Sequence, residues 1–530
     1  MMAGLELEHP PTGRRLESLQ EKDGLFIALL LTLLALVVHF VFYRRFRHLP
    51  PGPWPWPVVG NLFLLGKSPH QAFAHLAKKY GPLVYLRLGS RHTVIVSSPA
   101  MAKEFLLTHD HVFQYRRPST ITAILNNGKN IAQSSGPLWR QLRKICMTGL
   151  FSTKCIHSFQ AVRIKEIRST MKDIKIKAQE GKVVDLDFQL SLLATNIMTE
   201  MAFGKRYFGA DEKGEKEARH LKQIVGDIFG AFATVIIGDY VPSLWWVSKL
   251  QGVEAPLYDL RKRMNQVAQG ILDEHRRDNA TTDHQDSTYN DKPKDFIDVL
   301  LSERLDDGSG KLSDDTIQAV LYDLLAAGTD TTSVTLQWAM AELIRNPKLM
   351  KHAQDELDTV VGTDRVVEES DLQHLPYLQA IIKETFRFHP AAPFTLPHMS
   401  LESCQVAGYY LPPKTRVMVN LWAMGRNPDV WERPLEFDPE RFLEHPEIEW
   451  NGRSFELLPF SSGRRACPGQ PLAELVIQLA LAHLVHSFNW SLPNQQEPHT
   501  LDMSDKFGLT LPRAQPLHAM AHPRLPTHLY

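Results

Sequence analysis

The sequence predicts a mainly α-helical protein with a minor β-sheet region, preceded by one apolar segment long enough to cross a membrane. Three observations predict this arrangement. From about residue 99 to 390 the apolar residues mostly follow helical spacing. Short alternating segments typical of strands occur at 83–97, around 405–420 and after residue 500. The long apolar segment occupies residues 24–43.

The composition excludes several classes of protein. The chain has 530 residues, of which 43% are apolar, and its 59 basic residues balance its 59 acidic ones. A chain of this kind can bury a large core and is not disordered. The zero formal charge argues against a nucleic-acid binder, which needs a basic surface. Four scattered cysteines without a CxxC pair argue against a disulfide scaffold and against a structural zinc site.

The apolar segment at 24–43 has twenty residues and no formal charge. As a helix it is about 30 Å long, which matches the core of a bilayer. Three arginines follow directly, at 44, 45 and 47, and such a cluster is typical of the cytosolic side. A cleaved signal peptide is the alternative, but the run is too long and no small-residue cleavage site follows it. We therefore expect a tail at 1–23, a transmembrane anchor at 24–43, a basic and Pro-rich hinge at 44–60, and one domain at 61–530.

The sharpest chemical signal lies in Pro459–Gly469, which reads PFSSGRRACPG and precedes an apolar run with helical spacing. Pro468 suits the first position of that helix. Cys467 is then predicted at the cap, where free N–H groups and the helix dipole favour a thiolate. A lone cysteine is normally only a small buried apolar side chain. Here five positions agree at once, in the pattern F-x-x-G-x-R-x-C-x-G.

The neighbours of this cysteine also have predicted roles. Phe460 is placed to shield the sulfur, and Arg465 is placed to reach a carboxylate. Gly463 is expected to adopt φ > 0 in a tight loop, and Gly469 to let a flat ligand approach the backbone.

The segment resembles the haem-binding loop of the cytochrome P450 haem-thiolate monooxygenases. The resemblance implies haem b (heme, iron protoporphyrin IX) with Cys467 as the axial ligand of the iron, and Phe460, Gly463, Arg465 and Gly469 around it. It also implies the fold of that family, a mainly helical haem domain with a minor β-sheet region.

A second motif lies inside a long predicted helix. Ser313 and two following aspartates are typical of a helix start, and the helix is expected to end at Asn346-Pro347. Its middle, residues 327–332, reads AGTDTT and places a glycine, an acid and three hydroxyls in a buried helix, which is energetically costly. Hydroxyls that hydrogen-bond back to the helix are the structural alternative.

The AGTDTT run resembles the P450 motif (A/G)-G-x-(D/E)-T-(T/S). The resemblance implies that Thr331 and Asp330 deliver protons during oxygen activation, while Gly328 and Ala327 leave space. Such a proton chain must lie within hydrogen-bond reach of the oxygen that it serves.

Glu384 and Arg387 are three residues apart and lie on one helix face. Alone, such a pair is most often a weak surface ion pair. Glu384 shares its face with apolar residues, however, so burial of the pair is expected. Together with Arg441, the pair resembles the family's structural Glu-Arg-Arg triad.

Two further segments resemble parts of the family that bind the haem propionates. Trp139 and Arg143 match its W-x-x-x-R helix and are expected to face one propionate. His398 lies where the family places a basic partner of a propionate, with a solvated histidine as the alternative.

Substrate-pocket residues are inferred only from their positions in the family. They are mostly apolar, which suits a lipophilic or aromatic substrate. The candidates are Ile121, Leu324, Ala327, Ala392, Phe394 and Leu509.

The chain has no P-loop and no dinucleotide-binding glycine motif, so its electrons must come from another protein. The resemblance implies an NADPH-dependent flavoprotein reductase, which we expect to dock on the basic residues Arg140, Lys144 and Lys154. It also implies a single-pass protein of the endoplasmic reticulum membrane, with its catalytic domain in the cytosol.

The sequence is most similar in style to land-plant microsomal members of the family, several of which hydroxylate phenylpropanoids, flavonoids or related aromatics. Hydroxylation of such a compound with O2 is the leading hypothesis. The alternatives are hydroxylation of a terpenoid or fatty acid, an oxygen-independent rearrangement or dehydration at the same haem, and a non-catalytic haem sensor or carrier.

Overall fold

The computed structural model describes residues 26, 31, 32, 48–206, 212–282, 295–306, 308 and 310–530. The chain divides into two compact units. The larger unit comprises Pro51–Ser403 and Pro412–Tyr530, and the smaller comprises Met1–Pro50 and Cys404–Leu411. Everything that positions the candidate site belongs to the larger unit.

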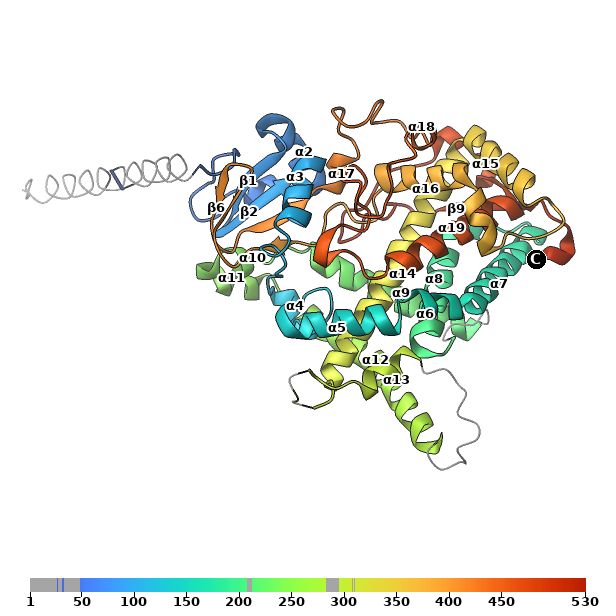
Figure 1. Ribbon diagram of the computed structural model, residues 1–530, viewed down its shortest axis with the longest axis horizontal. Coiled ribbons are helices and arrows are strands. Elements are labelled where there is room, and N and C mark those ends of the chain that lie inside the picture. The colour runs from blue at the N-terminus through green and yellow to red at the C-terminus, as the bar shows by residue number, and fades with distance from the viewer. Residues whose placement is uncertain are drawn as a thin grey trace, which may run out of the picture. The chain divides into compact units, whose positions relative to one another are not determined.

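The larger unit is mainly helical, as the sequence predicts (Figure 1). Its α-helices are α2 (Pro69–Tyr80), α3 (Pro99–Lys103), α4 (Thr120–Asn126), α5 (Gly136–Gly149), α6 (Thr153–Ser158), α7 (Gln160–Gln179), α8 (Leu186–Phe203), α9 (Glu212–Ala233), α10 (Ile237–Tyr240), α11 (Trp245–Leu250), α12 (Glu254–Thr282), α13 (Phe296–Ser302), α14 (Asp314–Arg345), α15 (Pro347–Val360), α16 (Pro376–Phe388), α17 (Leu421–Met424), α18 (Arg441–Glu444) and α19 (Gln470–Ser487).

The strands form small sheets. In the larger unit they are β1 (Leu83–Leu88), β2 (Arg91–Val96), β3 (Val184–Asp185), β4 (His398–Met399), β7 (Arg416–Val419), β8 (Phe488–Ser491) and β9 (His518–Pro523). One sheet has the order β1-β2-β7-β4, in which only the β2–β7 pair is parallel, and another has the order β3-β9-β8. In the smaller unit, β5 (Cys404–Val406) pairs with β6 (Tyr409–Leu411).

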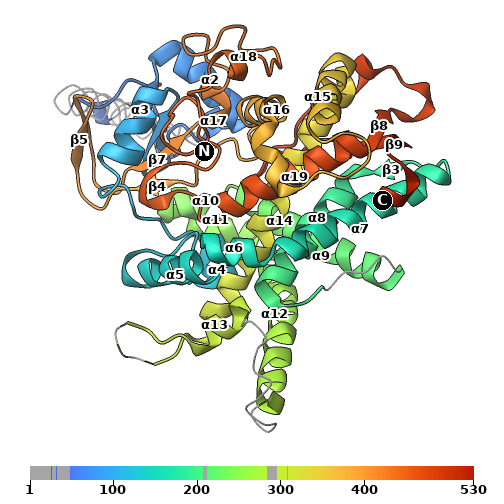
Figure 2. The same cartoon turned by 45° about the vertical axis from the view of Figure 1, so that its right-hand side comes forward.

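Helix α14 forms the centre of the larger unit. Figures 1 and 2 show it in the interior, and it packs against α8, α19, α16 and α12. Its start agrees with the prediction, because the Ser313 side chain accepts a hydrogen bond from Thr316 N. It ends at Arg345, directly before Asn346-Pro347. The motif at 327–332 therefore lies in the middle of a long buried helix, next to the cavity described below.

Three segments of the larger unit show how the local sequence folds. In the segment 83–97, where strands were expected, β1 and β2 pair as an antiparallel hairpin around Gly89-Ser90. Helix α12 continues into the polar stretch that begins at Arg276, and the helix ends at Thr282; residues 283–294 lie outside the described part. Within the hinge expected at 44–60, Pro51 O accepts a hydrogen bond from Tyr85 N in β1 at 2.8 Å.

The predicted membrane anchor at 24–43 falls almost entirely outside the described residues. Among the residues that the structure describes, no helix is long and apolar enough to cross a membrane.

Candidate active site

The larger unit encloses a cavity of about 340 Å³. One part of its wall comes from α14, between Asp323 and Thr335. Another part comes from the loop before α19 and the first two turns of that helix, between Pro459 and Ile477. Much of the remaining wall comes from α5, α8 and the segments around residues 391–398 and 509–510, and single residues such as Arg116, Ile131 and Phe229 complete it. The two sequence motifs with the strongest chemical signal thus line the same cavity.

Cys467 faces this cavity from the loop before α19. Its backbone N–H donates to Phe460 O at 2.9 Å, which fixes the loop behind the sulfur. Burial raises the pKa of the Cys467 thiol, while the backbone N–H groups of Gly469 and Gln470 and the Arg143 guanidinium act to lower it. The N–H groups at the helix start therefore favour the thiolate, as predicted, but they do not outweigh burial.

The start of α19 needs correction. Cys467 was predicted at the cap with Pro468 as the first helical residue, whereas the N-cap is Gly469 and the helix begins at Gln470. Pro468 and Gly469 instead form a turn that brings the sulfur close to the free N–H groups. These N–H groups still stabilise a negative charge on the sulfur, because the stabilisation depends on their distance from it and not on which residue is the cap.

The two glycines of the loop differ in what they require. Gly463 has φ +72°, and a Cβ there would meet Leu106 O at 1.9 Å, so only glycine fits. At Gly469 a Cβ would lie 3.9 Å from Cys467 Sγ, which is ordinary contact. Gly469 lines the cavity, and the absence of a side chain there leaves room for a ligand to approach the backbone.

Three guanidinium groups line one region of the cavity: those of Arg116, Arg143 and Arg465. Arg465 stacks over the Trp139 ring at 4.0 Å and donates to Gln114 O and Ser134 O. Arg465 contacts no carboxylate among the described residues, so the expectation that it reaches one stays a prediction about a bound group. Arg143 donates to Ala466 O at 2.8 Å, in the loop that carries Cys467. None of the three forms an ion pair within the described residues.

Burial and mutual repulsion destabilise the positive charges of the arginine cluster. Burial and the neighbouring Arg465 lower the pKa of Arg116 to about 9. Burial and Arg143 lower the pKa of Arg465 to about 10. Buried cations without anionic partners are costly, so this part of the cavity is suited to an anionic group. His398 is buried beside them and donates from Nδ1 to Phe113 O at 3.1 Å, and its pKa is lowered by burial and by Arg116.

Arg116 and Asp323 were missed in the sequence. Asp323 accepts from Asn130 Nδ2 at 2.6 Å and from Ala132 N at 2.9 Å, and Ala132 O accepts in turn from Arg116. Burial raises the pKa of Asp323 to about 6, partly offset by these donors. Asp323 thus fixes the loop that orients Arg116. Asp323 could have been found from the sequence, because an acidic residue among the apolar residues Tyr322, Leu324 and Leu325 is unusual in a buried helix. No feature of the sequence around Arg116 distinguishes it from an ordinary surface arginine.

The side chains of the AGTDTT motif point in different directions. Thr331 Oγ1 donates to Ala327 O at 2.7 Å, which is the back-bonded arrangement considered as the alternative, and both residues line the cavity. Because its proton is committed to Ala327, the Thr331 hydroxyl is free only to accept a hydrogen bond from the cavity. Asp330 is turned toward Thr510, whose hydroxyl donates to Asp330 Oδ2 at 2.6 Å.

Gly328 lines the cavity, where it was expected to leave space. A Cβ there would lie 2.3 Å from Met198 Cε of α8, so any larger residue would displace the end of that flexible side chain.

Most of the predicted pocket residues line the cavity. Those that do are Leu324, Ala327, Ala392, Phe394 and Leu509. Ile121 does not, and this prediction is corrected: it is buried on α4 in the main apolar core. The chain reaches the cavity a few residues later, at Ile131 and Ala132, after α4 has ended.

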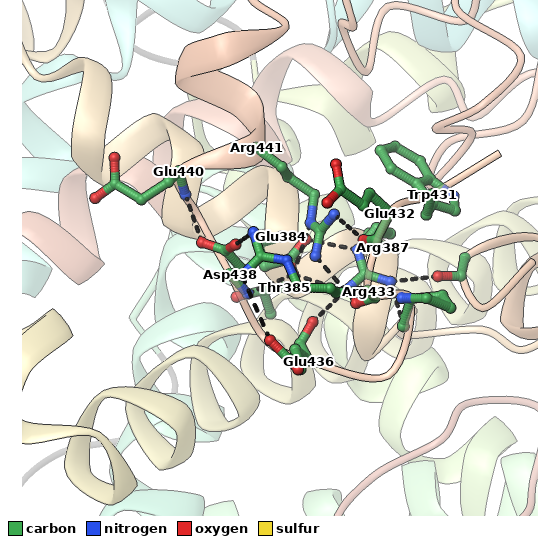
Figure 3. A network of polar contacts seen from close by, with 12 residues as sticks. Glu384, Thr385, Arg387, Trp431, Glu432, Arg433, Glu436, Asp438, Glu440 and Arg441 are labelled. Carbon is green, nitrogen blue, oxygen red and sulfur yellow. Dashed lines mark hydrogen bonds and ion pairs between the residues drawn. The ribbon is translucent and has the colours of Figure 1, made fainter. Parts of the chain in front are cut away.

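The predicted triad lies outside the cavity and is fully hydrogen-bonded (Figure 3). Arg387 binds both oxygens of Glu384 at 2.6 Å, and Arg441 Nε lies 3.3 Å from Glu384 Oε1. Asp438 N donates to the same oxygen at 2.7 Å. The free guanidinium N–H groups reach backbone carbonyls, among them those of residues 432, 434 and 436. The triad ties α16 to the segment around α18.

The donor set of the cavity fits haem. The described residues contain no group of three or more His, Cys, Asp or Glu side chains able to hold a metal ion. A metal held by Cys467 would therefore take most of its ligands from a bound group rather than from these side chains. A flat, largely apolar macrocycle with two carboxylates matches the apolar wall, the space beside Gly469 and the unpaired arginines.

The comparison with known families agrees with this site. The model of the family described as "Cytochrome P450" matches residues 50–518. The chain belongs to the cytochrome P450 family. Family membership brings with it the haem-thiolate cofactor and the monooxygenase reaction class.

Curated relatives of this P450 are plant proteins. Flavonoid 3'-monooxygenase of Petunia hybrida is 41% identical over 94% of this chain and 97% of its own length. Cytochrome P450 703A2 of Arabidopsis thaliana is 41% identical over 91% and 94%. A flavonoid 3',5'-hydroxylase of Eustoma exaltatum subsp. russellianum is 38% identical over 93% and 95%.

A solved zebra fish cytochrome P450, in a structure with abiraterone, shares the fold of this P450. It has a TM-score of 0.71 and 28% sequence identity, and the match covers 87% of this chain and all of that one. The same protein family thus accounts for the helical architecture, the small sheets and the cavity.

Proposed function

We propose that this P450 hydroxylates a flavonoid or a related phenylpropanoid at the cavity between Cys467 and Thr331. The overall reaction is RH + O2 + NADPH + H⁺ → ROH + H2O + NADP⁺. The observation that carries the proposal is the cavity itself, in which apolar side chains such as Leu324, Phe394 and Leu509 adjoin both motifs. Relatives named as flavonoid hydroxylases support the substrate class.

The residues of the chain have distinct tasks in this proposal. Cys467 would hold the haem iron, and Arg116, Arg143, Arg465 and His398 would hold the haem carboxylates. Bound haem supplies the oxygen-activating chemistry. Thr331 accepts a hydrogen bond in the cavity, and Asp330, one residue earlier on α14, supplies protons from the protein side.

The substrate class is tested by titrating the purified holoprotein with flavonoids, phenylpropanoids, terpenoids and fatty acids and recording the haem absorption spectrum. A flavonoid or phenylpropanoid is expected to displace water from the iron and to be hydroxylated when reductase and NADPH are added. Binding and turnover of a fatty acid or terpenoid alone would overturn the substrate class. Terpenoids and fatty acids are included because the sequence leaves their hydroxylation open as an alternative.

Thr331→Ala is expected to keep the haem spectrum while diverting most electrons from NADPH into hydrogen peroxide. The physical reason is the loss of the Thr331 hydroxyl, which lines the cavity beside Asp330 and can accept a hydrogen bond there; correctly positioned proton transfer contributes about 10²–10⁴-fold. The measurement is product and peroxide formed per NADPH consumed. Thr331→Ser, which keeps the hydroxyl, is the control. Full coupling in the alanine variant would contradict the role of Thr331.

Measuring product formation and NADPH consumption with and without reductase also distinguishes the other two hypotheses, a rearrangement or dehydration at the haem and a non-catalytic haem protein. A rearrangement or dehydration would proceed without reductase and NADPH. A haem sensor or carrier would consume no NADPH with any ligand. The alcohol at Thr331 favours monooxygenation over both.

We also propose that the reductase docks over α5. Arg143 and Trp139 turn inward from this helix to the cavity, whereas Arg140 and Lys144 are exposed on its outer side. Lys154, in α6, is exposed as well. None of the three exposed cations has an ion-pair partner in the described part of the chain. An acidic flavoprotein surface would therefore meet these cations outside the loop that carries Cys467.

Reversing the charge of Arg140, Lys144 and Lys154 together is expected to slow haem reduction about tenfold or more at low ionic strength and little at high ionic strength. The measurement is the reduction rate with reductase in stopped flow. Lys348→Glu in α15, an exposed lysine outside this face, is the matched control. Equal slowing at both ionic strengths would rule out electrostatic docking here.

For the membrane we propose the arrangement expected from the sequence: tail 1–23, anchor 24–43, hinge 44–60 and monooxygenase domain 61–530, with a single span in the endoplasmic reticulum membrane and the domain in the cytosol. The uncharged run and the arginines after it support this topology. Protease added to sealed microsomes should degrade the domain. Complete protection of the domain would mean that it lies on the lumenal side of the membrane and would contradict this topology.

A further inference from the structure

The inference concerns how Asp330 is held, and it rests on the proposed role of Asp330 as a proton donor. Asp330 lies on α14 next to Thr331, but its carboxyl group is largely buried and its only side-chain hydrogen bond among the described residues is to Thr510. Thr510 belongs to the C-terminal segment before β9, far from α14 in the sequence. The Thr510 Oγ1 to Asp330 Oδ2 distance is 2.6 Å.

A hydroxyl is well suited to this contact. It donates to the ionised carboxylate and, after rotation, accepts from the protonated acid, so it serves both states of a group that passes protons. A valine of the same shape serves neither state. The short distance indicates a charge-assisted hydrogen bond, which is stronger than one between neutral groups.

Charged groups also approach Asp330 from the two helices that pack against α14 on this side. Lys222 of α9 donates to Asp187 Oδ2 of α8 at 2.5 Å, and both side chains are partly exposed to solvent. Lys222 lowers the pKa of Asp330 and Asp187 raises it, while burial gives the net upward shift. This surface ion pair therefore lies within electrostatic reach of Asp330.

We propose that Thr510 is a positioning residue that holds the Asp330 carboxyl group in the orientation from which it passes a proton toward the cavity. Thr510 takes part by orientation only and does not touch the substrate.

The central experiment compares Thr510→Val with Thr510→Ser, with Thr500→Val as the matched control. Thr500 is an exposed threonine of the same C-terminal region whose hydroxyl makes local contacts, donating to Glu497 O and accepting from Gln496 Nε2. All variants are loaded with haem and checked by the spectrum of the reduced carbonyl complex. If valine prevents haem retention, Thr510→Ala, which adds no bulk, takes its place.

The first readout needs no turnover. Infrared difference spectra recorded against Asp330→Asn report the protonation of the Asp330 carboxyl group as pH is varied. Loss of the Thr510 hydrogen bond removes a contact that favours the charged form, so the midpoint should rise by about one pH unit in Thr510→Val. Thr510→Ser and Thr500→Val should titrate like the wild type. An unchanged midpoint in Thr510→Val would overturn the inference.

The second readout needs no known substrate. Oxygen reduced without substrate ends as peroxide, O2 + NADPH + H⁺ → H2O2 + NADP⁺, or as water, O2 + 2NADPH + 2H⁺ → 2H2O + 2NADP⁺. Thr510→Val should shift this partition toward peroxide about tenfold, with rescue in Thr510→Ser. If the partition shifts toward peroxide in Asp330→Asn but not in Thr510→Val, the positioning role of Thr510 is wrong while the proton-donor role of Asp330 stands. An unchanged partition in Asp330→Asn would overturn the proton-donor role itself.

Discussion

Glu384→Ala is expected to yield protein that fails to retain haem and is strongly destabilised. The carboxylate is fully buried and neutralises two buried guanidinium groups, those of Arg387 and Arg441. Its removal leaves both cations without an anion and frees the N–H of Asp438. Breaking a buried ion pair on one side costs about 3–5 kcal/mol, a large part of the 5–15 kcal/mol that stabilises a typical domain.

Haem content per protein and the thermal unfolding midpoint measure this effect. Asp355→Ala is the control: it breaks an exposed pair with Lys351 on α15 and should cost less than about 1 kcal/mol. Glu384→Gln keeps the shape and one acceptor, so it should be damaged less than the alanine variant. A well-folded, haem-loaded Glu384→Ala protein would contradict the burial argument (Figure 3).

Cys467→Ser is expected to abolish the thiolate signature of the reduced carbonyl complex and to reduce monooxygenase activity to background. Serine keeps the size of the side chain and can still accept the N–H groups of Gly469 and Gln470. Its hydroxyl is, however, neither a soft ligand nor an anion near neutral pH, so it does not donate electron density to iron as a thiolate does.

The control for this variant is Cys155→Ser, which changes a cysteine outside the cavity whose sulfur contacts Gly149 O. It should keep both spectrum and turnover. Retention of the thiolate spectrum in Cys467→Ser would mean that another residue coordinates the metal, and the assignment of the whole cavity would then fail.

The long elements and the signature motifs were predictable because each depends on local chemistry. The start of α14 follows from the Ser313 side chain and its end from Pro347, and both signals act within one helical turn. The hairpin at Gly89-Ser90 is similarly local. The triad was also found, because Glu384 and Arg387 share a helix face, although Arg441 required the family resemblance.

What could not be predicted depends on contacts between distant segments. Arg116 becomes a cavity residue only because carbonyls at 132, 396 and 397 accept its N–H groups. Thr510 meets Asp330 across 180 positions of sequence. Ile121 was misplaced for the same reason: its apolar character suits either a pocket or a core, and only the packing of α4 decides for the core.

The clash that a side chain at position 463 would have with Leu106 O has a practical consequence for engineering. The signature around the cysteine is short, yet the backbone that gives it its shape belongs to the first quarter of the chain. Transplanting residues 459–469 into an unrelated helical scaffold would therefore not reproduce the loop, because the scaffold would lack the backbone that packs against the turn at Gly463. A successful graft must import a substitute for the 104–108 segment as well.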